Sequence, residues 1–158
     1  MSGNLSKIPC ILKKNRRKCT QSEIHNEKIN HGDIVNNALL VFFGCGIGGL
    51  LRYYTSRLIC SFIDSPFPYS TLFINISGSF IMGLLFTWLL RHNSNLTQSL
   101  GPFLLIGLLG GYTTFSAFSV ETLGLIHSGK LFQALLYALV SVLLCVGGAS
   151  LGMAIAKA

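Results

Sequence analysis

Four long apolar segments follow one another along this chain, and they constrain its fold more than any other feature. They run over residues 36–59, 71–90, 101–120 and 131–156, and each matches the roughly 20 residues that a helix needs to cross a bilayer. The apolar runs are continuous and do not alternate, which excludes a transmembrane β-barrel. The sequence therefore predicts an all-α integral membrane protein with four transmembrane helices, multi-pass in the cell (inner or plasma) membrane.

The few charged residues are gathered at one end of the chain. Charged residues make up 11% of the sequence, against about 25% in a soluble domain, and seven of the 12 Lys and Arg lie before Asp33. We expect residues 1–33 to be a basic, disordered tail beside anionic lipid headgroups, and residues 34–158 to form the membrane domain. A basic tail without a basic face on a fold does not indicate nucleic-acid binding.

Glycines recur four residues apart within the spans. Such pairs let helix backbones approach closely in lipid, and they occur at Gly44 and Gly48, Gly107 and Gly111, and Gly148 and Gly152. A single bundle packed this tightly is small for a pore. We therefore expect a dimer, in which a second subunit supplies the rest of the pore wall.

The third segment contains a stretch that disfavours a continuous helix. Gly110 and Gly111 are followed by several hydroxyl residues, among them Thr113, Thr114 and Ser116. We predict a break near Gly110 to Thr113, because broken backbone persists in a membrane only where it is buried or binds a ligand. Freed carbonyls at such a break suit Na⁺. The alternative is a glycine kink whose backbone is satisfied by neighbouring hydroxyls.

Two phenylalanines follow this break. Phe115 and Phe118 are three residues apart, so on a resumed helix they share a face. The positive edge of an aromatic ring can line an anion path without the grip of an arginine. By spacing alone, the two rings could equally be ordinary core or lipid-facing aromatics.

Polar residues form two stripes at a spacing of four. One stripe comprises Thr71, Asn75 and Ser79, and the other comprises Tyr137, Ser141 and Cys145. The Asn75 amide could donate to a passing anion, or it could hold two helices together. Two facing stripes would make a narrow track of hydrogen-bond donors.

Titratable groups are scarce in the apolar segments. They hold no Asp, Lys or His; Arg52 and Glu121 lie at their margins, and Arg57 lies near the end of the first segment. A proton-coupled transporter needs a titratable group in its path, and a hydrolase needs a base. The sequence therefore predicts that the protein is not an enzyme and favours passive conduction.

Three motifs resemble those of the CrcB/Fluc family of fluoride channels. The motifs span residues 48–53, 70–80 and 110–119, and Glu121 follows the third motif. Their order and spacing match that family over about residues 36–156. The resemblance implies an antiparallel, dual-topology homodimer with two fluoride pores, through which fluoride leaves the cell. The one departure is Ala117, where the family often has threonine.

The resemblance also implies a role for each candidate residue. It implies a structural Na⁺ at the dimer interface, bound by the backbone carbonyls of Gly110 and Thr113 from both subunits. It implies that Arg52, at the end of the first helix, attracts anions at a vestibule. The pore residues that it implies are Asn75, Thr114, Phe115, Ser116, Phe118, Tyr137 and Ser141.

Three alternatives remain open on the sequence alone. The chain could be a non-conducting subunit, an obligate heterodimer partner of an oppositely oriented paralogue, or a small proton-coupled efflux transporter. The last of these needs a membrane-embedded glutamate in the first helix, and none is present there.

Overall fold

The computed structural model describes residues 31–92 and 100–158. The predicted tail lies outside the described residues except for residues 31–33, where the first helix has already begun. The chain divides into a unit of residues Met1–Asn36 and a unit of residues Asn37–Ala158, and the second unit contains the helix contacts that build the bundle.

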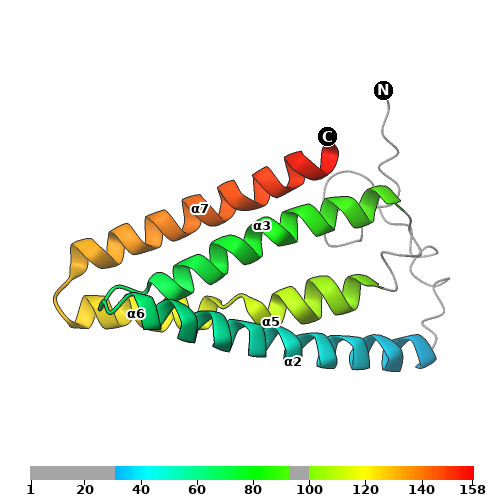
Figure 1. Cartoon of the computed structure of the whole chain (residues 1–158), viewed down its shortest axis with the longest axis horizontal. Coiled ribbons are helices and arrows are strands. Elements are labelled where there is room, and N and C mark those ends of the chain that lie inside the picture. The colour runs from blue at the N-terminus through cyan, green and yellow to red at the C-terminus, as the bar shows by residue number, and fades with distance from the viewer. Residues whose placement is uncertain (1–30, 93–99) are drawn as a thin grey trace, which may run out of the picture. The chain divides into compact units, whose positions relative to one another are not determined.

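Helices account for all four predicted spans. Helices α2 (His31–Phe62), α3 (Tyr69–His92) and α7 (Leu131–Lys157) are continuous, whereas the third span consists of three pieces (Figure 1). Within residues 31–92 and 100–158, four helical stretches are long and apolar enough to cross a membrane, at Ile34–Phe62, Tyr69–Arg91, Pro102–His127 and Leu131–Lys157. The predicted spans are confirmed, and each of them ends later than predicted.

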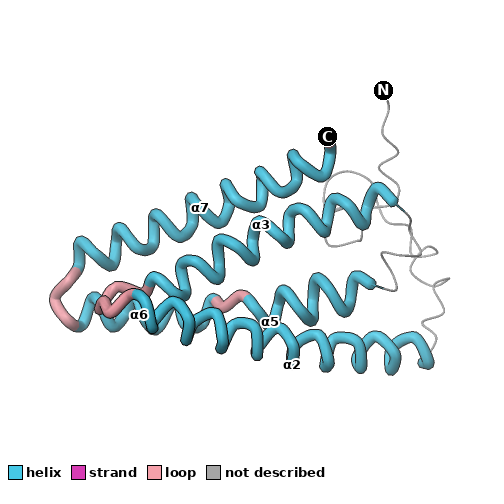
Figure 2. The backbone as a smooth tube through the Cα atoms, in the orientation of Figure 1, coloured by secondary structure: helices cyan, strands magenta, loops and turns pink. Residues whose placement is uncertain are grey.

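The third span is interrupted near its middle. It begins as a π-helix, η3 (Pro102–Leu109), continues as α5 (Gly110–Tyr112), and resumes as α6 (Phe115–His127). Thr113 and Thr114 between them are extended, with ψ angles of 157° and 117°, and this loop is visible in Figure 2. The helix therefore breaks at the far end of the predicted stretch, and the two glycines before it remain helical.

The glycines serve close packing. A Cβ on Gly111 would lie 2.7 Å from the Cys45 carbonyl oxygen, and one on Gly44 would lie 2.9 Å from the Gly107 Cα. On the other side of the bundle, a Cβ on Gly152 would lie 2.8 Å from the Leu84 amide nitrogen. Because backbone meets backbone at these points, the predicted role of the glycine pairs is confirmed.

Helices α3 and α7 run side by side and pack closely against each other (Figure 1). At one end of this pair, Arg91 donates to the Ala156 carbonyl oxygen over 2.8 Å, which satisfies a free carbonyl in the last turn of α7. At the other end, Gly129 has a φ angle of 75° and closes the turn between α6 and α7. This pair provides one wall of a cleft beside the third span.

Candidate functional site: an uncharged cleft beside the broken helix

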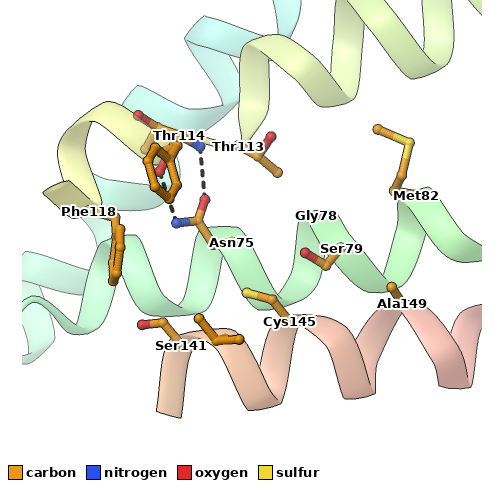
Figure 3. Close-up of a pocket in the computed structure, with 12 residues that line it drawn as sticks. Asn75, Gly78, Ser79, Met82, Thr113, Thr114, Phe118, Ser141, Cys145 and Ala149 are labelled. Atoms are coloured by element: carbon orange, nitrogen blue, oxygen red, sulfur yellow. Dashed lines mark hydrogen bonds between the residues drawn. The ribbon is translucent and has the colours of Figure 1, made fainter. Parts of the chain in front are cut away.

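A cleft of about 340 Å³ lies where α3, α7 and the interrupted third span meet (Figure 3). Five of the predicted pore residues line it: Asn75, Thr114, Phe115, Phe118 and Ser141. Thr113, Ser79 and Cys145 line it too, and none of the lining residues carries a charge. Two residues of each predicted polar stripe therefore line one cleft, whereas Thr71 and Tyr137 do not line it.

Asn75 joins α3 to the break in the third span. Its Oδ1 accepts from the Thr114 amide over 2.8 Å, and its Nδ2 donates to the Thr114 carbonyl oxygen over 3.0 Å. Figure 3 shows both bonds. The side chain thus replaces the helical partners that the extended backbone has lost. Asn75 therefore holds two helices together and also lines the cleft, and donation from its amide to an anion stays a prediction.

The two phenylalanines lie against each other at the start of α6. Their ring centroids are 5.5 Å apart with an angle of 41° between the planes. Phe118 also contacts the Tyr137 ring, at 5.2 Å between centroids, whereas the Phe115 side chain is 78% exposed. Phe118 is therefore fixed from within the subunit, and Phe115 has most of its surface free to meet something else.

Ser141 has a hydroxyl whose partner must come from the cleft. The residue is only 6% exposed, and its Oγ is buried with no hydrogen-bond partner among the described residues. A buried hydroxyl without a partner costs free energy, so it indicates a water or an ion that completes its bonding.

A second polar cluster, which the sequence did not predict, lies beside the cleft. The Glu121 carboxylate accepts from the Thr71 hydroxyl over 2.6 Å and from the Tyr137 hydroxyl over 2.8 Å. The Tyr137 ring is fully buried and does not line the cleft. The prediction that Glu121 lies at a margin is wrong, because α6 continues to His127 and carries the carboxylate inside the third span.

The remaining candidates lie apart from the cleft lining. Arg52 is half-buried in α2, which continues to Phe62 and does not end near Arg52. Ser116 is exposed, with its Oγ 3.2 Å from the Thr114 hydroxyl. Gly110 is exposed in α5, and the Thr114 amide that would donate to its carbonyl in an unbroken helix donates to Asn75.

Fold and site together define a multi-pass integral membrane protein with an uncharged polar cleft beside a broken span. The family described as "CrcB-like protein, Camphor Resistance (CrcB)" matches residues 39–153. The chain is 50% identical over 121 residues to the fluoride-specific ion channel FluC of Coxiella burnetii (strain Dugway 5J108-111), covering 77% of this chain and 98% of that protein. It is 48% identical over 124 residues to the fluoride-specific ion channel FluC of Beijerinckia indica subsp. indica, and the match covers 78% of this chain and 98% of that protein. The chain therefore belongs to the CrcB family, and the resemblance seen in its motifs is confirmed.

Proposed function

We propose that this protein is a fluoride-selective channel through which fluoride leaves the cell passively. The observation that carries the proposal is the cleft, where an amide, hydroxyls and aromatic rings meet without a charged side chain. Several relatives that share 41–50% of their residues with this chain are named fluoride-specific ion channels. An anion that meets only neutral donors can bind weakly enough to leave again, which conduction requires.

The start of α6 adds a fixed positive field to the cleft. The first amides of a helix have no intrahelical acceptor, and the helix dipole is positive at this end. Thr114 accepts from the Ala117 amide over 3.3 Å, which leaves the amides of Phe115 and Ser116 available for other acceptors. With the Asn75 amide and the Ser141 hydroxyl close by, the cleft presents donors from three helices to an anion.

A second subunit would complete the wall of the path. Thr114 is half-exposed and Gly110, Phe115 and Ser116 are exposed in one subunit, although irregular backbone is not tolerated against lipid. Gly46 and Gly49 on α2 have open space where a Cβ would be, as expected for a helix that packs against a neighbouring subunit. These features favour a dimer in which the partner covers the break.

The dimer interface would also hold the structural Na⁺. The carbonyl of Gly110 has lost its helical donor to Asn75, and Thr113 is extended, so both carbonyls suit a hard cation. The ion would neutralise carbonyl dipoles at the break and fix the two subunits against each other. No group of three or more His, Cys, Asp or Glu side chains that could hold a metal ion occurs within residues 31–92 and 100–158. Backbone oxygens are therefore the donor set for this ion.

The distribution of positive charge bears on the choice between a homodimer and pairing with an oppositely oriented paralogue. Apart from the tail, Arg91 and Lys157 lie toward one membrane face, and Arg57, Lys130 and, farther inside α2, Arg52 lie toward the other. Two basic residues on one face against three on the other is close to an even distribution. An even distribution of positive charge permits insertion in both orientations, as an antiparallel homodimer requires. The seven basic residues of the tail make the count nine against three, but only Lys28 and Lys18 lie within about 15–20 residues of the first span, so the shift toward an N-terminus inside the cell is smaller than this count suggests.

The rival transporter mechanism lacks support in the cleft. Glu121 is a carboxylate within a span, but it does not line the cleft, and two hydroxyls hold it. A proton-coupled carrier needs its titratable group where the substrate binds.

The decisive test is fluoride efflux from liposomes that contain the purified protein, with chloride efflux as the control. Fluoride is expected to leave rapidly without a proton gradient, and chloride is expected to stay inside. Phe115→Ile and Phe118→Ile are each expected to reduce the fluoride flux strongly while dimers still form, because an aliphatic side chain lacks the positive ring edge. Normal flux in both variants would refute the aromatic lining, and equal chloride efflux would refute fluoride selectivity.

A further inference from the structure

The cleft continues along α7 beyond the residues that contact the break. Ser141 and Cys145 lie one helical turn apart on the same face, and both line the cleft. Figure 3 shows the Cys145 side chain pointing from α7 toward α3. The chain thus places a thiol in the wall of the proposed path.

This thiol differs in its surroundings from the other described cysteines. Cys45 and Cys60 are exposed on α2 and do not line the cleft, whereas Cys145 is half-buried within it. Ser141 is 6% exposed and its hydroxyl lacks a partner among the described residues, so a water molecule or an ion in this part of the cleft would complete its bonding. Because a thiol reacts as the thiolate, it reacts where water can take up its proton and stays inert in lipid.

We propose that Cys145 is a modification site at which small, thiol-directed electrophiles close the channel. The inference rests on the proposed function. With methyl methanethiosulfonate, the Cys145 thiolate attacks the thiomethyl sulfur, a disulfide bond forms, and methanesulfinate leaves. The proton lost by the thiol passes to water, and the added thiomethyl group occupies the cleft between α7 and α3.

The test treats liposomes holding the full chain with methyl methanethiosulfonate and measures fluoride efflux before and after. The expected result is a large loss of efflux that dithiothreitol restores, with the added mass located on Cys145 by mass spectrometry. Cys145→Ser should remove the sensitivity to the reagent, which is measured for each variant as the ratio of its fluoride efflux after treatment to its efflux before treatment.

A matched control moves the thiol by one residue on the same helix. Val146 is 62% exposed and does not line the cleft, so Val146→Cys in the Cys145→Ser chain should react slowly and keep its efflux. Labelling of Cys145 without loss of efflux, failure to label it, or equal sensitivity in the Val146→Cys chain would each overturn the proposal. Absence of fluoride efflux before any reagent is added would instead refute the proposed function.

Discussion

The two hydrogen bonds between Asn75 and the broken span can be tested with a substitution that removes them and keeps the number of side-chain heavy atoms. Asn75→Leu would leave the amide and the carbonyl of Thr114 without the partners that now lie at 2.8 and 3.0 Å. Each backbone group left unsatisfied in a dry setting costs about 1–3 kcal/mol, so the loss in unfolding free energy should be about 2–6 kcal/mol. This loss in unfolding free energy exceeds the roughly 0.6 kcal/mol typical of hydrogen bonds between membrane helices. The reason is that the extended backbone at Thr114 has no helical hydrogen-bond partner that could replace Asn75.

Unfolding of the detergent-solubilised protein in sodium dodecyl sulfate provides the measurement, followed by the fluorescence of Trp88, the single tryptophan. Ser150→Ala is the matched control, because its hydroxyl donates only to the Val146 carbonyl of its own helix, on an exposed surface. The control should change the unfolding free energy by no more than about 0.5 kcal/mol. An Asn75→Leu value as small as that of the control would refute the idea that this side chain fastens the break.

Asn75→Asp separates the fastening role from the role in the path. A carboxylate keeps an acceptor for the Thr114 amide but faces the Thr114 carbonyl oxygen with a second oxygen, where the amide group donated over 3.0 Å. An ionised carboxylate would also repel an anion in the cleft. Fluoride efflux should therefore fall much further in this variant than the loss of folded protein explains. Efflux that falls only in proportion to folded protein would leave Asn75 with the fastening role alone.

The second polar cluster, the proposed Na⁺ site and the tail each give a further prediction. Tyr137→Phe removes a hydroxyl that donates to Glu121 over 2.8 Å, so the unfolding free energy should fall by about 1.5–3 kcal/mol; an unchanged value in the same detergent assay would contradict this. Thr113→Ala should cost only about 1 kcal/mol and should leave Na⁺ bound, because the proposed ligand is a carbonyl; loss of the ion from a high-resolution structure of this variant would refute it. Topology reporters fused to the C-terminus should shift toward one orientation when residues 1–30 are present, and equal signals from both sides would show that the tail is silent.

The spans and the two polar stripes were predictable because they depend on local sequence. Hydropathy over some 20 residues fixes a span, and a spacing of four places polar side chains on one helix face. The spacing does not indicate which residue on a neighbouring helix each polar side chain of a stripe contacts. Along one face of α3, Thr71 contacts Glu121, Asn75 contacts Thr114, and Ser79 lies on the cleft.

The details of the third span were harder to predict from sequence. Two glycines beside several hydroxyl residues indicated a break, but Gly111 is needed for contact with Cys45 on α2, and the chain extends only at Thr113 and Thr114. The helical pairing that Thr114 loses is replaced by Asn75, which lies 39 residues away along the chain. No local pattern links such residues, and the same holds for Tyr137 and its carboxylate partner.

The two clusters of the site divide its tasks between stability and conduction. Glu121 is held by Thr71 and Tyr137, and the Tyr137 ring packs against Phe118, so the charged group positions one wall of the cleft while staying out of it. A carboxylate that lined the path would repel an anion, whereas one held behind an aromatic wall fixes that wall and leaves neutral donors facing the ion. The lining of the cleft carries no charged side chain, although it includes the Cys145 thiol, and the premise that no carboxylate lies within a span was wrong.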